Sequence, residues 1–429
     1  MENIYVESFG CSANYGEGEA IKGLLHKSKF NIREKKDDAD VIVLNICTVK
    51  GTANALREIR KTKEAFPHKK LIVAGCVSRD IIDPIKALDP DASLLSTHNI
   101  QDIVPVVEET LNANPVTEMA PHPQVKLSLP KIRRNPVVGI IPISNGCDSA
   151  CTFCSTKLIK GWHKSYPIDA LVNEIKNCLS DGCKEIWLTG QDTSCYGQDI
   201  GTNLPTLLKH LCAVDGQFHL RLGMANPKHF PTFLNELIEA YQNQKMFRFL
   251  HIPVQSGNND ILKAMKREYT IEQFEDMVTC IRATYPDLTL STDIIVGFPG
   301  ETREQFVQSL DLIKRLQFDI VNISRFASRP GTQAAKIEAQ IDGNEKKERS
   351  RIMTTICEHV GFARNQTWKK WEGDIVIDEQ GKNNTWVGRN YAYKTVVVQG
   401  EFKLGDKVRV KITDIANFFL WGEVLEFAR

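Results

Sequence analysis

Short apolar runs alternate with amphipathic stretches over residues 1–111 of the chain. The runs at 3–10, 40–47 and 70–76 read NIYVESFG, DVIVLNIC and KLIVAGC, and their Val, Ile and Leu content predicts strands buried in a sheet. A helical pattern covers 54–64, between two of these runs. Because strands that alternate with helices form βαβ units, this region is predicted to be an α/β domain with a parallel sheet.

A second and longer α/β pattern covers residues 137–365. Helical patterns such as 169–179 and 271–285 separate its strand candidates, which are 137–144, 185–190, 218–224, 248–254, 288–298 and 320–326. Six βα steps predict a partial or complete βα barrel. The reactive groups of such a barrel lie at the C-terminal ends of its strands, so we expect functional residues there.

The segment 112–136, between these two regions, is rich in proline. Its prolines, which exclude a continuous helix, are Pro115, Pro121, Pro123, Pro130 and Pro136. The segment is therefore predicted to be a linker, and Lys131, Arg133 and Arg134 make its end basic.

From residue 366 to residue 429 the pattern changes to short alternating strands separated by Gly or Asn turns. This predicts a small antiparallel β-barrel, a fold often used to hold nucleic acid. Two sets of side chains suit that use: Lys382, Arg389, Lys394, Lys407 and Arg409 for phosphates, and Trp386, Tyr391 and Tyr393 for stacking on unpaired bases. The alternative for each aromatic is a place in the core of the small barrel. The whole chain is thus predicted to be a multidomain α/β protein with a C-terminal β-barrel.

Length and charge limit the class of protein. A chain of 429 residues is too long for one hydrophobic core. No apolar run approaches the roughly 20 residues of a membrane helix, and the start MENIYVESFG has no secretion signal, so we expect a cytoplasmic protein without a membrane span. The net charge of +1 gives no overall attraction to nucleic acid, so any such contact would depend on local patches.

Three of the twelve cysteines lie together in the stretch NGCDSACTFCSTK, at Cys147, Cys151 and Cys154. A zinc site would usually gain a fourth Cys or His at a regular spacing nearby, which His163 does not provide. The CTFC segment alone resembles a dithiol redox pair, but such a pair would not need Cys147. Iron–sulfur ligation suits all three thiolates, and it leaves one iron without a protein ligand.

A second trio is spread over the N-terminal region. Cys11, Cys47 and Cys76 each lie at or just beyond the C-terminal end of a predicted strand. These ends share one edge of a parallel sheet, where ligands of open α/β sheets bind, so the three thiols can meet in space. Helical patterns begin shortly after each, and helix N-termini favour thiolates. The alternative is three unrelated small core residues. The other cysteines, which have no ligand spacing and are expected to be buried, inert thiols, are Cys178, Cys183, Cys195, Cys212, Cys280 and Cys357.

The cysteine spacing C-x3-C-x2-C after a strand that opens a βα barrel resembles the radical S-adenosylmethionine superfamily. With the N-terminal cysteine trio ahead of it and a final barrel that resembles the TRAM domain, nearly the whole chain resembles the methylthiotransferase family. Further segments that match this family are LTGQD at 188–192, LHIPVQSG at 250–257, MKREYT at 265–270, TDIIVGFPGET at 292–302 and RPGTQAA at 329–335.

Local segments favour one branch of that family. NICTVKGTA around Cys47, with KGWHKSYPIDALV, GQDIGTNLPTLL and RLGMANP, resembles the archaeal and eukaryotic branch, which thiomethylates threonylcarbamoyladenosine beside the tRNA anticodon. The bacterial branch that acts on isopentenyladenosine usually has GR-x-R-S where this chain has GWHKS at 161–165. The branch that modifies a ribosomal-protein aspartate usually has Pro where this chain has Ser12, and CGF where it has CTV at 47–49. These two substrates are the alternatives, and a radical enzyme or iron–sulfur binding module without sulfur transfer is a third.

The resemblance implies two [4Fe–4S] clusters with separate tasks. The cluster on Cys147, Cys151 and Cys154 would bind S-adenosylmethionine through its free iron and deliver the electron that splits it. The resulting deoxyadenosyl radical would take hydrogen from carbon 2 of the modified adenine. The second cluster, on the N-terminal cysteine trio, would hold the sulfur or methylsulfide, and a second S-adenosylmethionine would supply the methyl group.

The resemblance also implies further binding residues and partners. Gln191 lies where the superfamily usually contacts the amino group of S-adenosylmethionine, commonly with Glu. Other residues implied near the cofactor, the substrate or the nucleoside are Gln255, Ser256, Arg267, Gly297, Pro299 and Gly300. The structural alternatives are strand-end capping, a solvated charge and a tight turn. The implied partners are tRNA, bound through its anticodon stem-loop, and an electron donor such as flavodoxin or ferredoxin.

Overall fold

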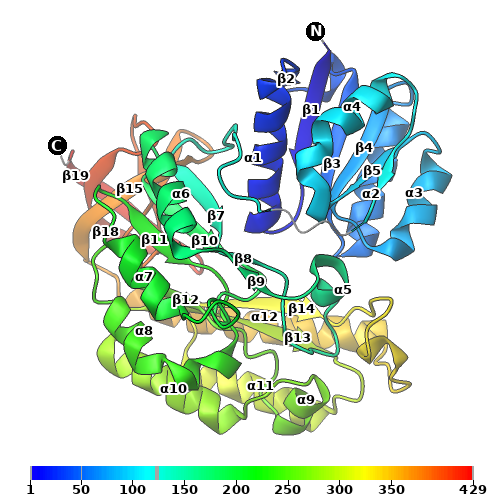
Figure 1. The fold of residues 1–429 in the computed structure, drawn as a ribbon. Helices are drawn as coiled ribbons and strands as arrows, with labels where there is room; N and C mark the ends of the chain where they lie inside the picture. Colours follow the sequence, from blue (N-terminus) through cyan, green and yellow to red (C-terminus); the bar gives the residue numbers. More distant parts are fainter. Residues whose placement is uncertain (1, 50, 121–124, 428–429) are drawn as a thin grey trace.

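The computed structural model describes residues 2–49, 51–120 and 125–427, so Pro121 and Pro123 of the linker lie outside the described residues. Three sheet-bearing regions follow one another along the chain, and the N-terminal and C-terminal ones lie on opposite sides of the view in Figure 1. No helix in the described part of the chain is both long and apolar enough to cross a membrane.

The N-terminal region is built on one parallel sheet. Its strands are β1 (Asn3–Ser8), β2 (Asn31–Arg33), β3 (Val41–Cys47), β4 (Lys70–Cys76), β5 (Ser93–Ser96) and β6 (Thr117–Glu118), in the spatial order β2-β1-β3-β4-β5-β6. Every pairing in it is parallel. The last strand comes from the proline-rich segment predicted to be a linker, which therefore returns to the sheet edge before it continues.

Helices cover both faces of this sheet. They are α1 (Ser12–Lys27), α2 (Thr52–Ala65), α3 (Ile82–Leu88) and α4 (Ile103–Leu111). On one face α1 buries Ile21 and Leu25 against the strands, and on the other α2 buries Ile59. Because both faces are covered, β3 is apolar almost throughout and wholly buried, as the continuous apolar run predicted.

The central region is a partial βα barrel of six parallel strands. They are β7 (Val138–Pro142), β10 (Glu185–Thr189), β11 (His219–Leu222), β12 (Phe249–His251), β13 (Thr289–Val296) and β14 (Ile320–Arg325). They form two parallel sheets, β11-β10-β7 and β12-β13-β14, joined by a single parallel bridge between Leu220 and Met246. The six predicted strands are thus all present, and no pairing between β7 and β14 closes the barrel among the described strands.

Several of the helices around this barrel begin after a capping side chain. They are α5 (Thr156–Lys160), α6 (Ile168–Ser180), α7 (Leu204–Cys212), α8 (Leu234–Ala240), α9 (Asn259–Ala264), α10 (Ile271–Thr284), α11 (Arg303–Leu316) and α12 (Gly343–Gln366). Thr270 and Gln273 form a capping box at α10, and Thr302 and Gln305 form another at α11. These caps fix where α10 and α11 start, and α11 directly follows the loop after β13.

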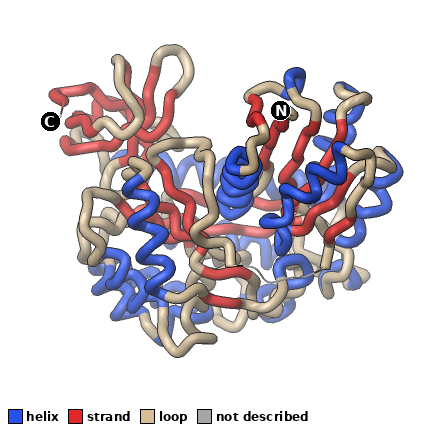
Figure 2. Tube along the Cα trace, turned by 45° about the horizontal axis from the view of Figure 1, so that its top comes forward, coloured by secondary structure: helices blue, strands red, loops and turns tan. Residues whose placement is uncertain are grey.

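The C-terminal region is a closed five-stranded barrel. Its strands are β15 (Glu372–Gln380), β16 (Thr385–Arg389), β17 (Thr395–Gln399), β18 (Lys407–Ile415) and β19 (Leu420–Phe427), in the order β15-β16-β17-β19-β18. Figure 2 shows strands joined by loops here, whereas helices accompany the other two regions. Four pairings are antiparallel, as predicted, and β17 pairs with β19 in parallel.

Candidate active site at the strand ends

The three N-terminal thiols come together at one edge of the N-terminal sheet. Cys47 and Cys76 are the last residues of β3 and β4 and are direct partners in their ladder. Cys11 is the N-cap of α1. Gly10 has a positive φ of 132°, and a Cβ built on it would lie 2.6 Å from the Cβ of Cys47, so the loop before α1 packs against the Cys47 side chain. The parallel-sheet geometry therefore assembles a trio that is far apart in sequence.

The charge state of this trio suits metal binding. The hydrogen bond from Cys47 lowers the pKa of the Cys11 thiol to about 5, although burial opposes this. The contact with Cys47 also lowers the pKa of Cys76, and Cys47 itself has a raised pKa because it carries the shared proton. Asn14, in the first turn of α1, accepts a hydrogen bond from Cys76 Sγ at 3.2 Å. Cys11 and Cys76 thus ionise readily, and a metal ion bound to the trio would displace the proton of Cys47.

The second trio lies on the loop between β8 (Ser144–Asn145) and α5. Backbone hydrogen bonds clamp this loop from two sides. Thr152 donates its N–H to the carbonyl of Met265 at 3.1 Å and accepts one from Ala334 at 2.9 Å. Arg329, in the RPGTQAA segment, donates to the carbonyl of Phe153 at 2.9 Å. The loop is thus held in shape by the α9 end and by the segment after β14.

Arg267 reaches this loop directly. Its guanidinium donates to Cys151 Sγ at 3.3 Å, to the carbonyl of Pro253 at 3.1 Å and to the Tyr269 hydroxyl at 3.0 Å. Burial raises the pKa of Cys147 to about 11 and also raises that of Cys151, where Arg267 opposes the effect. Arg267 is therefore placed to stabilise negative charge on Cys151, as a ligand thiolate would carry.

Replacing Arg267 by Gln is expected to weaken iron retention by the Cys147–Cys154 loop by roughly 10–100-fold, the usual effect of losing a group that supports a metal ligand. The measurement is the rate of iron loss to a chelator from anaerobically reconstituted protein. Arg315→Gln is the control, because Arg315 is exposed and pairs only with Glu275 in the described part of the chain. Equal iron loss from both variants would contradict the role given to Arg267.

The other residues implied near the cofactor occupy strand-end loops. Gln191 follows β10, and its Oε1 accepts the N–H of Gly146, next to Cys147, at 2.7 Å. Gln255 follows β12 with a positive φ of 74°, a strained conformation of the kind that concentrates at functional sites. Ser256 is buried and accepts the N–H of Asn258.

Gly297 directly follows β13 with a positive φ of 72°, and its N–H donates to the Glu301 carboxylate at 2.8 Å. A Cβ on it would lie 2.3 Å from the Lys346 side chain, so the tight turn requires glycine. Ser256 and Gly297 thus have turn roles whether or not they also contact a ligand, whereas Gln191 and Arg267 contact the cysteine loop itself.

The inside of the barrel is a cavity of about 770 Å³, within the usual range for a small-molecule site. All six barrel strands contribute to its wall. The N-terminal region adds Cys11 and Tyr15, and the C-terminal barrel adds Gln380 and Arg389. Cys11 therefore faces a cavity that is lined by all three regions.

Four polar residues of the barrel interior were missed by the sequence reasoning. The guanidinium of Arg221 lies 4.8 Å from the ring centre of Phe249, and Arg221 lines the cavity. His251 also lines the cavity and pairs with Asp293 at 2.8 Å, and Asn322 donates to the same carboxylate. The sequence feature that could have identified them is a charged or polar side chain at an inward-facing position of an otherwise apolar strand.

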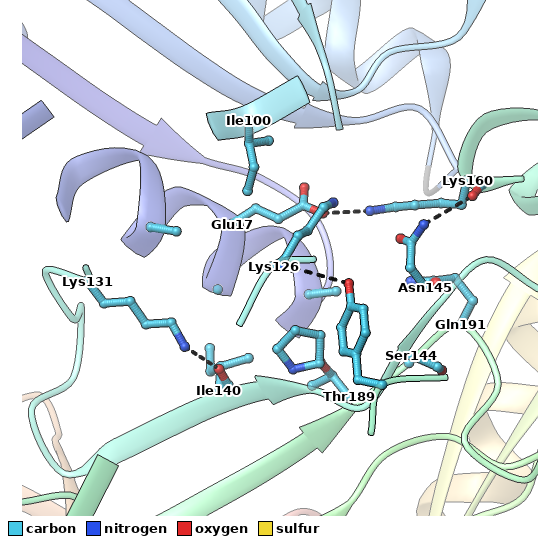
Figure 3. A pocket seen from close by; sticks show the side chains of 16 residues that line it. Glu17, Ile100, Lys126, Lys131, Ile140, Ser144, Asn145, Lys160, Thr189 and Gln191 are labelled. Atoms are coloured by element: carbon cyan, nitrogen blue, oxygen red, sulfur yellow. Dashed lines mark hydrogen bonds and ion pairs between the residues drawn. The ribbon is translucent and has the colours of Figure 1, made fainter. Parts of the chain in front are cut away.

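A buried charge network joins the N-terminal region to the barrel (Figure 3). Glu17 of α1 binds Lys126 of the linker at 2.6 Å and Lys160 of α5 at 2.7 Å, and Thr97 donates to the same oxygen. The second carboxylate oxygen of Glu17 has no hydrogen-bond partner, and the adjoining cavity of about 20 Å³, which Gln191 also lines, has room for one water molecule.

The pKa values of this network show which interaction dominates. Burial alone would raise the pKa of Glu17, but attraction to Lys126 and Lys160 outweighs it and lowers the value to about 2. Burial lowers the pKa of Lys126 to about 8. Burial opposes the charge of Lys160 as well, yet attraction to Cys76 and Glu17 raises its pKa. Lys160 therefore links the cysteine loop of the barrel to the N-terminal trio.

The prediction of a nucleic-acid surface on the C-terminal barrel is wrong for some of its residues. Lys394 is buried and binds Asp319 at 2.8 Å, and Tyr393 packs edge-on against Phe247. Both therefore hold the C-terminal barrel on the central one, as does Tyr391, whose hydroxyl donates to an aspartate of the central region. Arg389 is paired with Asp378 in the cavity wall, and Trp386 is partly buried. Exposed basic side chains remain at Lys382, Lys407 and Arg409.

Three family models match successive parts of the chain. The uncharacterized protein family UPF0004 matches residues 3–96, the radical SAM superfamily matches 141–313 and the TRAM domain matches 372–425. Each match covers one of the three sheet-bearing regions.

Solved structures share the fold. A radical S-adenosylmethionine methyltransferase, TsrM, from Kitasatospora setae, with cobalamin and a [4Fe–4S] cluster bound, superimposes with a TM-score of 0.56 at 12% identity, covering 78% of this chain and 77% of that one. The cobalamin-dependent S-adenosylmethionine radical enzyme OxsB, with aqua-cobalamin and S-adenosylmethionine bound, gives a TM-score of 0.50 at 13% identity, covering 81% and 56%.

Relatives match the chain from end to end. The probable threonylcarbamoyladenosine tRNA methylthiotransferase of Pyrococcus abyssi is 40% identical over 437 residues, covering 99% of this chain and 100% of that protein. The threonylcarbamoyladenosine tRNA methylthiotransferase of Homo sapiens is 36% identical over 443 residues, covering 100% of this chain and 75% of that protein. These matches confirm the resemblance drawn from the cysteine spacing and the flanking segments: the chain is a radical S-adenosylmethionine enzyme and belongs to the threonylcarbamoyladenosine tRNA methylthiotransferase family.

Proposed function

We propose that this enzyme adds a methylthio group to carbon 2 of threonylcarbamoyladenosine next to the anticodon of tRNA. The observation that carries the proposal is the pairing of two separate thiol trios, one at the N-terminal sheet edge facing the barrel cavity through Cys11 and the other on the loop that opens the barrel. A radical enzyme without sulfur transfer would need only the second trio. The relatives named above carry the same activity in their names.

Each trio would hold one [4Fe–4S] cluster. Cys147, Cys151 and Cys154 would bind the first, and Cys11, Cys47 and Cys76 the second. When bound, these clusters and S-adenosylmethionine supply the one-electron chemistry and the sulfur. The residues of the chain bind and orient: Arg267 supports the Cys151 thiolate, and Lys160, close to Cys76 and Glu17, supplies positive charge near the N-terminal trio.

The remaining assignments concern the cofactor and the nucleoside. Gln191 would contact the amino group of S-adenosylmethionine, since its side chain lies against Gly146 beside the first thiol. Gln255, Ser256 and Gly297 would shape the strand-end loops around it. The cavity of about 770 Å³ would admit the modified adenosine, with Arg221 and its aromatic neighbours on the wall.

The partner molecules follow from the same reasoning. The anticodon stem-loop would lie across the mouth of the cavity, with phosphates near the exposed Lys382, Lys407 and Arg409 of the C-terminal barrel. The electron would come from a reduced protein such as flavodoxin or ferredoxin, and the enzyme would work in the cytoplasm.

The test uses anaerobically reconstituted enzyme with S-adenosylmethionine, a reductant and three substrates in parallel. We expect methylthiolation of tRNA that carries threonylcarbamoyladenosine, and none of tRNA that carries isopentenyladenosine or of a ribosomal protein. Product on either of the other two substrates, without product on the first, would overturn the proposal in favour of that alternative.

A further inference from the structure

Three metal-binding side chains with no part in the proposed reaction converge beside the cysteine loop. Asp192 and Cys195 lie in the loop after β10, and His229 lies in the short helix Pro227–Thr232 after β11. One donor atom of each lies within 4.8 Å of the others, and the Asp192 and Cys195 side chains are almost fully buried. Carboxylate, thiolate and imidazole are together the ligand types of a mononuclear transition-metal site.

The Asp192 carboxylate indicates that a cation belongs there. Its Oδ1 is saturated, since it accepts the N–H of Ser194 at 3.0 Å, the hydroxyl of Ser194 at 2.6 Å and the N–H of Asn226 at 3.0 Å. Its Oδ2 is buried without a hydrogen-bond partner and faces Nε2 of His229 at 4.0 Å. A buried carboxylate oxygen left unpaired costs free energy, whereas a metal ion between these two atoms would satisfy both.

His163 holds Cys195 from outside this group. Its Nδ1 is hydrogen-bonded to Cys195 Sγ at 3.3 Å. Its other ring nitrogen, Nε2, is bonded to Ser165 Oγ at 2.9 Å and lies 3.6 Å from Asp199. His163 is therefore a positioning residue for the thiol and not a ligand.

His229 is oriented by a hydrogen bond at its other ring nitrogen. The side-chain amide nitrogen of Gln198 is hydrogen-bonded to His229 Nδ1 at 3.0 Å. This contact turns Nε2 towards Asp192 Oδ2, which lies 4.0 Å away. A metal ion on Nε2 would take the place of the hydrogen on that nitrogen.

We propose that Asp192, Cys195 and His229 bind one zinc ion, separate from both thiol trios. The mixture of one sulfur, one nitrogen and one oxygen favours zinc over magnesium or calcium, which prefer oxygen, and over iron–sulfur clusters, which prefer thiolates. One carboxylate and one thiolate neutralise the ion. Three protein ligands leave the fourth position of a tetrahedral ion to water.

The ion would brace the loop that carries the first trio. His163 donates its backbone N–H to Asp148 at 3.1 Å, and Asn226, which bonds Asp192, donates its side-chain amide to Ser149 at 3.1 Å. Asp148 and Ser149 lie between Cys147 and Cys151. The zinc ligands and their hydrogen-bond partners therefore join the loops after β10 and β11 to the Asp148 and Ser149 side chains between two cluster cysteines.

The first measurement is metal content by elemental analysis of the full chain, grown with zinc and reconstituted anaerobically with iron and sulfide. We expect about one zinc per chain besides the iron. Cys195→Ala, His229→Ala and the isosteric Asp192→Asn should each lower zinc content at least tenfold while the iron bound by the N-terminal trio remains, which shows that the chain is folded. The matched controls, Cys212→Ala and His210→Ala, change a buried cysteine and an exposed histidine of α7 and should keep the zinc.

The second measurement is zinc K-edge X-ray absorption on the same holoprotein, which reads the zinc ligands without reference to activity or to iron. We expect one sulfur at about 2.3 Å and three nitrogen or oxygen ligands at about 2.0 Å. Absence of zinc from the unchanged protein, unchanged zinc in Cys195→Ala, or three or more sulfurs around zinc would each overturn the proposal.

Discussion

Replacing Cys11, Cys47 and Cys76 together by alanine is expected to abolish methylthio transfer while cleavage of S-adenosylmethionine continues. The three thiols form one donor set at the strand ends, so their loss removes about four irons per chain, one cluster's worth. The loop that holds the other trio is clamped by its own contacts to the α9 end and to Arg329, and it stays in place. Iron and sulfide analysis, together with assays of 5′-deoxyadenosine and of methylthiolated product, measure both effects on one sample.

The matched control replaces three cysteines outside both trios, Cys178, Cys183 and Cys212, which are buried free thiols of the central region. This variant should retain all iron and should transfer sulfur. If the N-terminal triple variant kept its full iron content, or if its product still carried new sulfur, the two-cluster account would fail.

Replacing Glu17 by Gln is expected to destabilise the contact between the N-terminal region and the barrel by about 3–5 kcal/mol, because two buried lysines then lose their counter-charge. Opening of α1 should become more frequent by a factor of roughly 10² or more, since 1.4 kcal/mol corresponds to tenfold. Hydrogen exchange of the α1 amides, read by mass spectrometry, measures this opening directly.

The Glu17 carboxylate also makes the stability of this contact depend on pH. Its pKa is about 2 in the folded chain, below the ordinary value of 4.5, so its stabilising contribution is complete above about pH 4.5 and is lost as the pH falls towards 2. Glu17→Gln should remove this part of the acid sensitivity. Unchanged protection of α1 in the variant at pH 7 would show that the network does not hold the two regions together.

Two controls separate the buried network from charge in general. Glu239→Gln breaks an exposed pair with Lys209 and should cost at most about 1 kcal/mol. Replacing Glu17, Lys126 and Lys160 together by Met removes all three charges and should recover much of the loss, because no buried charge is then left unpaired.

The thiol trios show what sequence patterns can predict. Cys47 and Cys76 were placed correctly because the end of an apolar run marks the end of a buried strand. The parallel register then brings the ends of neighbouring strands together. The βα barrel was predicted from the same alternation of strand and helix. The short strands β5 and β6 were missed because SLLS and TE are too brief and too polar to show a period.

Charged residues show where such patterns fail. Lys126, Lys160 and Lys394 have the sequence surroundings of solvated charges, yet all three are buried against carboxylates of distant elements. Cys195 was expected to be an inert thiol because no other Cys or His lies at a ligand spacing near it in the sequence. The fold brings His229 to it from the short helix after β11 and His163 from the segment after α5, and no spacing in the sequence indicates either contact.

The most direct test of the proposed function is mass spectrometry of nucleosides from total tRNA, compared between cells with and without this protein. The account predicts that the methylthiolated form of threonylcarbamoyladenosine disappears without the protein, that its unmodified precursor accumulates, and that the intact chain restores it whereas a chain with Cys147→Ala does not. An unchanged methylthiolated threonylcarbamoyladenosine peak in cells that lack the protein would contradict the account.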